Sequence, residues 1–150
     1  MTSTYTLKVN EIKSNHYSIL DDSYTERFNI EAGELQLFLY NAPPLDFENE
    51  DIFVTFIMTP IHGTTPYMAG KFCEKRDANE CLKNLKNSDV LHGRKNLQSS
   101  INQNGVYELT IDHDEENCKI YFDNNCTYVI AVSNSDSTSS SAYQLYASHS

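Results

Sequence analysis

The chain has 150 residues, a length that suits one domain (residues 1–150) with a continuous core. Its 11 basic and 21 acidic residues give a formal net charge of -10, which would repel a polyanion and excludes nucleic acid as a partner. The longest apolar run, residues 52–58, is far shorter than the roughly 18 residues of a membrane-spanning helix, so we expect no membrane span.

Short stretches of alternating apolar and polar residues predict β-strands along the whole chain. Residues 35–40 are apolar on both faces, which favours a central position in a sheet. Pro43 and Pro44 end this strand, because proline cannot donate to the ladder. In chain order, the predicted strands are residues 5–9, 17–20, 24–30, 35–40, 52–58, 71–73, 96–101, 106–111, 118–122, 128–133 and 142–147.

One short helix is predicted over residues 77–86, where Asp77, followed by Glu80 three residues later, resembles a helix start. The apolar residues at helical intervals in this segment are Ala78, Cys81, Leu82 and Leu85. Many short strands and at most one short helix favour an all-β fold, an antiparallel β-sandwich. We expect its core to contain Phe28, Ile30, Leu35, Leu37, Leu39, Val54, Phe56, Val106, Leu109, Ile120, Tyr128, Ile130, Val132 and Tyr143.

The four cysteines indicate the compartment. Seven residues separate Cys73 from Cys81, and seven separate Cys118 from Cys126, which predicts two local disulfides and an extracellular or cell-surface location. Crossed pairings, free buried thiols and a zinc site are the alternatives, and the ligand spacing is unusual for zinc. Asn125 lies in an N-glycosylation pattern close to a Ser-rich tract that is either sugar-coated or a flexible loop.

The two ends of the chain show the same alternation. Residues 3–9 and 141–147 each place an aromatic and two apolar residues on one face, which favours terminal strands that join neighbouring copies head to tail by strand addition. The residues assigned to this assembly are Tyr5, Leu7, Val9, Tyr143 and Leu145. The alternative is that two ordinary strands match by chance.

The order of several phrases resembles the bacterial pre-peptidase C-terminal domain family and its eukaryotic surface relatives. These phrases are residues 24–35, 51–54, 105–107, 128–133 and 142–145. The resemblance implies a jelly-roll-like β-sandwich attached to a secreted protease or surface protein, where it assists secretion, binds polymers or proteins, or holds calcium. The segment 60–103 is a long insertion relative to the family pattern.

Two acidic clusters are candidates for a metal-binding or a catalytic site. Asp46, Glu48, Glu50 and Asp51 would suit Ca²⁺, which binds six to eight oxygen ligands, although solvated loop carboxylates are the commoner outcome. Residues 112–116, with a histidine between carboxylates, have no nucleophile motif nearby and fit a hairpin turn better than a catalytic site.

Tyrosines that suit sugar stacking or protein contact form a further candidate surface: Tyr17, Tyr40, Tyr67, Tyr121 and Tyr146. We therefore expect a non-enzymatic extracellular adhesive, structural or binding module without a cofactor. Its partners would be like subunits, or a surface protein or glycan. The alternative is a calcium- or carbohydrate-binding accessory domain of a secreted hydrolase.

Overall fold

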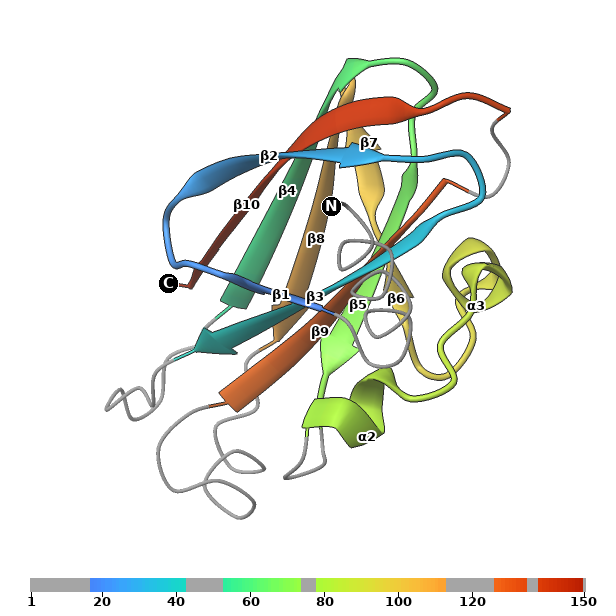
Figure 1. Ribbon diagram of the computed structural model, residues 1–150. Coiled ribbons are helices and arrows are strands. Elements are labelled where there is room, and N and C mark those ends of the chain that lie inside the picture. Colours follow the sequence, from blue (N-terminus) through green and yellow to red (C-terminus); the bar gives the residue numbers. More distant parts are fainter. Residues whose placement is uncertain (1–16, 43–52, 74–77, 113–125, 135–137, 150) are drawn as a thin grey trace, which may run out of the picture.

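The computed structural model describes residues 17–42, 53–73, 78–112, 126–134 and 138–149 (Figure 1). Within these residues, ten strands form two five-stranded sheets that pack as a β-sandwich, together with two short helices. The predicted β-sandwich is confirmed. Neither helix in this part of the chain is long and apolar enough to cross a membrane.

The first sheet, sheet A, has the strand order β1-β3-β9-β5-β6. Its strands are β1 (Ser18–Leu20), β3 (Leu35–Ala42), β9 (Cys126–Ser133), β5 (Tyr67–Phe72) and β6 (Gln98–Ser99). The short edge strand β1 runs parallel to β3, so the predicted purely antiparallel pairing is wrong at this edge. All other pairs in sheet A are antiparallel.

The second sheet, sheet B, has the strand order β2-β10-β4-β8-β7, and all its pairs are antiparallel. Its strands are β2 (Thr25–Ile30), β10 (Ser141–His149), β4 (Phe53–His62), β8 (Val106–Asp112) and β7 (Ile101–Gln103). The predicted single strand over residues 96–101 is instead divided between β6 in sheet A and β7 in sheet B. Ser100 lies between them and donates its N–H to the carbonyl of Met68 (3.1 Å).

The expectation of at most one helix is wrong. Helix α2 (Ala78–Leu82) ends early, because Asn84 adopts a left-handed backbone conformation (φ 64°) that a continuing helix does not allow. A second helix, α3 (Asn87–His92), then begins. The Asp89 carboxylate accepts the N–H of Lys86 (2.8 Å) and so satisfies one of the free donors at the helix start.

The core between the sheets is built from aromatic and aliphatic side chains on the inward faces. Tyr40 meets Phe56 edge to face with a centroid distance of 5.6 Å, and Phe28 meets Phe38 at 4.8 Å. The predicted core residues that are buried between the sheets are Ile30, Val54, Phe56, Leu109, Tyr128, Ile130, Val132 and Tyr143. The prediction is wrong for Leu35, Leu37 and Leu39, which pack on the outer face of sheet A, where Leu39 is buried. Phe28, Leu35, Leu37 and Val106 are only half-buried, and Ile120 lies outside the described residues.

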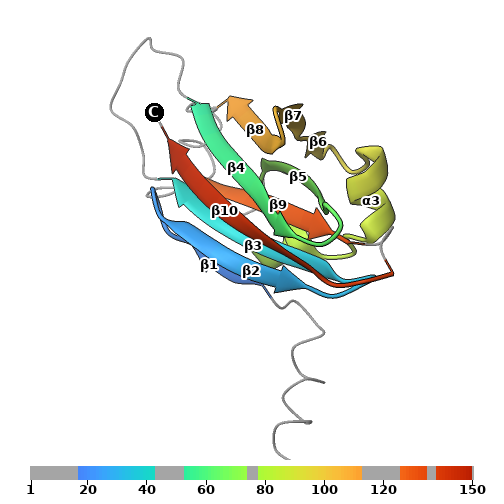
Figure 2. The same ribbon diagram turned by 90° about the horizontal axis from the view of Figure 1, so that it is seen from above.

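A second apolar cluster covers the outer face of sheet A. Val129 and Ala131 of β9 point to this side, while Ile130 and Val132 point into the sandwich. Leu82, Leu85 and Val90, from the α2–α3 region, belong to the same outer cluster. Both helices contact β9, and helix α3 also contacts β5 (Figure 2). The helices therefore cover the outer apolar face of a sheet that is apolar on both faces.

Gly70 of β5 lies where side chains of both sheets pack tightly against the backbone. A Cβ atom at this position would lie 2.7 Å from Ile130 Cδ1, 2.8 Å from the Val129 carbonyl oxygen and 2.9 Å from Leu109 Cδ2. Ile130 and Leu109 come from different sheets. A side chain at residue 70 would therefore push the layers apart.

We predict that Gly70→Ala lowers the free energy of unfolding by about 1–3 kcal/mol through overpacking. Urea denaturation would measure this loss. Ile130→Val removes the atom nearest to the new methyl group. Alone, it should lower the free energy of unfolding by about 1 kcal/mol, and in the Gly70→Ala background it should lower it little or not at all. Additive losses would contradict the close contact.

Candidate functional site

The predicted calcium ligands Asp46, Glu48, Glu50 and Asp51 lie outside the described residues, and so does the glycosylation candidate Asn125. In the part of the chain that the structure describes, no group of three His, Cys, Asp or Glu residues could hold a metal ion. The calcium site and the glycosylation site stay predictions. The predicted hairpin over residues 112–116 also lies mainly outside the described residues.

One disulfide joins Cys73, directly after β5, to Cys81 of α2. The bond ties the start of the helical segment to sheet A, and both cysteines belong to the outer apolar cluster. Cys126 opens β9 and is buried, whereas Cys118 lies outside the described residues. The Cys118–Cys126 pairing therefore stays a prediction.

The assembly role of Tyr143 and Leu145 stays a prediction, but the position of their strand does not favour it. Both residues lie in β10, which is hydrogen-bonded to β2 on one side and to β4 on the other. Both side chains are fully buried in the core. A strand with two partners has no free backbone groups to offer a neighbouring copy. Tyr5, Leu7 and Val9 lie outside the described residues.

The longest edge strand, β2, is also poorly suited to accept another strand. The Gln36 side chain donates to the Asn29 carbonyl (2.7 Å), and the Asn134 amide donates to the carbonyls of Ile30 (3.5 Å) and Glu31 (3.2 Å). These side chains thus bond carbonyls at the C-terminal end of β2. Charged Glu26 and Arg27 lie in the remainder of β2, and charges on an edge discourage strand addition.

A polar cluster joins Asp22, Tyr40 and His149. The Tyr40 hydroxyl lies 2.6 Å from Asp22 Oδ1 and 2.8 Å from His149 Nδ1, and the last two atoms are 3.2 Å apart. Ser23 donates its N–H to the Ala147 carbonyl (2.8 Å) beside them. The cluster fastens the corner between β1 and β2 to the end of β10.

The pKa values of this cluster favour a protonated Tyr40 beside an ionised Asp22. Burial and the hydrogen bond to Asp22 raise the pKa of Tyr40 far above its usual value, so the phenol stays protonated and is a poor base or nucleophile. Burial opposes ionisation of Asp22, but the hydrogen bond from Tyr40 and the charge of His149 lower its pKa below the usual 3.8. The cluster is therefore a structural fastening.

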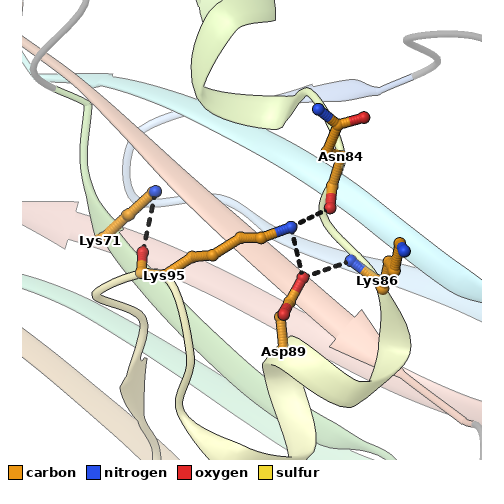
Figure 3. A network of polar contacts seen from close by, with 5 residues as sticks. All are labelled: Lys71, Asn84, Lys86, Asp89 and Lys95. Atoms are coloured by element: carbon orange, nitrogen blue, oxygen red, sulfur yellow. Dashed lines mark hydrogen bonds and ion pairs between the residues drawn. The ribbon is translucent and has the colours of Figure 1, made fainter.

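A second polar network holds the helical segment on sheet A (Figure 3). The Lys95 ammonium lies 3.0 Å from Asp89 Oδ2 and also donates to the Asn84 carbonyl, while Lys71 of β5 donates to the Lys95 carbonyl (3.0 Å). The hydrogen bond from Lys95 lowers the pKa of Asp89, which keeps this buried carboxylate ionised. Together with the disulfide, this network closes the outer face of sheet A.

The outer face of sheet B is different, because its side chains stay at least partly exposed. We call it the open face and define it by three rows of residues that lie opposite one another across the strands. The central row crosses all five strands and contains Thr25, Tyr146, Ile57, Glu108 and Ile101. The flanking rows are Ser148, Thr55 and Thr110 on one side and Arg27, Gln144 and Thr59 on the other.

The open face combines apolar residues in its central row with flanking rows that are mostly uncharged and polar. Tyr146 and Ile57 are half-buried neighbours, and Ile101 is 62% exposed. Arg27 and Glu108 are the charged residues of the three rows, and Glu108 accepts a hydrogen bond from the Thr110 hydroxyl (3.2 Å). The rows are therefore formally neutral, although the chain carries a net charge of -10.

The tyrosines predicted to form a contact surface lie in different parts of the structure. Tyr146 lies on the open face, while Tyr67 is exposed at the start of β5. Tyr40 is buried in the core, Tyr17 packs against the outer cluster of sheet A, and Tyr121 lies outside the described residues. The sequence could not rank them, because only the strand order shows which tyrosine has apolar and hydroxyl neighbours.

Comparison with known proteins identifies the fold. No protein-family model matches the chain, and no curated protein does. A solved structure of the pre-peptidase C-terminal domain of a collagenase from Bacillus anthracis is similar, with a TM-score of 0.53 and 9% sequence identity. The match covers 88% of this chain and 94% of that domain. The two chains therefore share a fold, as the resemblance in the sequence implied.

The polar fastening at the β1–β2 corner should make stability depend on pH. An Asp22 pKa below 3.8 means that the ionised carboxylate stabilises the folded state above this pH, and that its contribution disappears as the pH falls through the folded-state pKa. We predict that Asp22→Asn unfolds at a lower urea concentration than the wild type at pH 5, and that the difference shrinks below pH 3.8.

Asp21→Asn is the matched control, because Asp21 is an exposed carboxylate at the adjacent position. It should follow the wild type at every pH. An Asp22→Asn difference that stays constant down to pH 2 would contradict the fastening.

Proposed function

We propose that this chain is a non-catalytic, extracellular binding module whose binding surface is the open face of sheet B. The observation that carries the proposal is the contrast between the two outer faces. A helical segment, a disulfide and an ion pair cover sheet A, whereas a row with Tyr146, Ile57 and Ile101 stays accessible on sheet B. Exposed apolar residues within a polar surround are typical of binding surfaces.

Three further observations support the proposal. The Cys73–Cys81 bond is of a kind that persists in oxidising compartments, which supports a location outside the cytosol. The fold likeness to the C-terminal domain of a collagenase supports an accessory role beside an enzyme or within a surface protein. The Asp22–Tyr40–His149 cluster supplies no activated nucleophile, which is consistent with a non-catalytic role.

Co-sedimentation with insoluble collagen, chitin and cellulose would test the proposed surface. We predict that the wild type is retained by at least one of these polymers and that Ile57→Arg, in the centre of the open face, loses most of the retention. A charged side chain there would be desolvated by any ligand that covers the row.

Tyr67→Arg is the control, because Tyr67 is exposed but lies in sheet A. It should be retained like the wild type. Equal loss in both variants, or no retention of the wild type by any of the three polymers, would contradict the proposal.

A further inference from the structure

We propose that the open face binds a neutral polysaccharide, whose sugar rings pack on Tyr146 and Ile57 while the flanking rows bond its hydroxyl groups. The inference rests on the proposed function and names the class of ligand. Its argument has three parts: the geometry of the central row, the chemistry of the flanking rows and the charge of the surface.

The central row is a continuous path across sheet B. Thr25, Tyr146, Ile57, Glu108 and Ile101 lie opposite one another on neighbouring strands. Strands are spaced about 4.8 Å apart, so five strands give a path of about 19 Å. An extended polymer crossing the strands would contact the row over several repeating units, whereas a single small molecule would cover only part of it.

The chemistry of the rows matches that of a sugar. A pyranose ring has an apolar face of C–H groups, which packs on an aromatic ring or an aliphatic side chain. Tyr146 and Ile57 are direct neighbours in the register of β10 and β4 and provide such a centre. Ser148, Thr55 and Thr110 form a row of hydroxyl groups on one side, and Gln144 with Thr59 lies on the other. These groups both donate and accept, as sugar hydroxyls do.

The charge distribution favours a neutral ligand over the competing occupants. Each chain carries a formal charge of -10, so a second copy or an acidic polymer would be repelled at long range, and the neutral rows offer no compensating attraction. A basic protein would be attracted to the acidic remainder of the molecule, because Arg27 and Glu108 cancel on the open face. A neutral ligand is not repelled at long range by the net charge of the chain.

Isothermal titration calorimetry with soluble cellohexaose, chitohexaose, laminarihexaose and mannohexaose would test the inference, with a heparin hexasaccharide as the charged comparison. We expect at least one neutral hexasaccharide to bind, with an affinity that changes less than twofold between 0.05 and 0.5 M NaCl, values chosen to span about 14 to 4 Å of Debye length. Tyr146→Ala should weaken binding about tenfold, whereas Tyr67→Ala should leave it unchanged.

Each alternative outcome is distinct. Neutral sugars that bind the wild type and Tyr146→Ala equally would overturn both the inference and the proposed surface. If the wild type binds no hexasaccharide but is retained on collagen, and Ile57→Arg loses this retention, the polysaccharide proposal is wrong. The open face would then still be the binding surface. Preferential binding of the heparin hexasaccharide, or a dimer in light scattering that Tyr146→Ala dissociates, would replace the neutral polysaccharide with a charged polymer or a second copy.

Discussion

The structure depends on the burial of β9 on both of its faces. Ile130 and Val132 pack between the sheets, while Val129 and Ala131 point outward from sheet A and would expose apolar surface to water if nothing covered them. Residues of the α2–α3 segment provide that cover. The Cys73–Cys81 disulfide and the Lys95–Asp89 ion pair hold the segment in place at its two ends.

This cover makes the two outer faces of the sandwich unequal. Two carboxylates of the described residues hold elements of the fold together. Asp22 links the β1–β2 corner to Tyr40, and Asp89 pairs with Lys95 at the helical segment. The open face of sheet B instead presents mostly uncharged residues, together with Arg27 and Glu108, whose formal charges cancel. The hydrogen bond described within its three rows joins the Thr110 hydroxyl to Glu108. The two outer faces therefore differ in chemistry. The three rows of the open face have no net formal charge, although the whole chain carries a net charge of -10.

Alternation in the sequence is a local property. It predicted most strands, and most of the predicted core residues that the structure describes are buried, including Phe56 and Tyr128. Strand order depends on pairing between distant segments, so the position of β10 between β2 and β4 could not be predicted from its pattern. The Tyr40–His149 contact joins residues 109 positions apart and gave no sequence signal for the same reason. Helix α3 was missed because it has six residues and owes its place to Asp89 and to packing on sheet A.

Hydroxyl-radical footprinting of the oxidised protein tests the central claim most directly, because it reports the solvent access of individual side chains. The account predicts rapid oxidation of Ile101 on sheet B, together with protection of Leu82 and Val90, whose side chains are buried between the helical segment and sheet A. Reduction of Cys73–Cys81 should raise the labelling of Leu82 and Val90. Labelling of these two residues as fast as Ile101 while the disulfide is intact would contradict the closed outer face of sheet A.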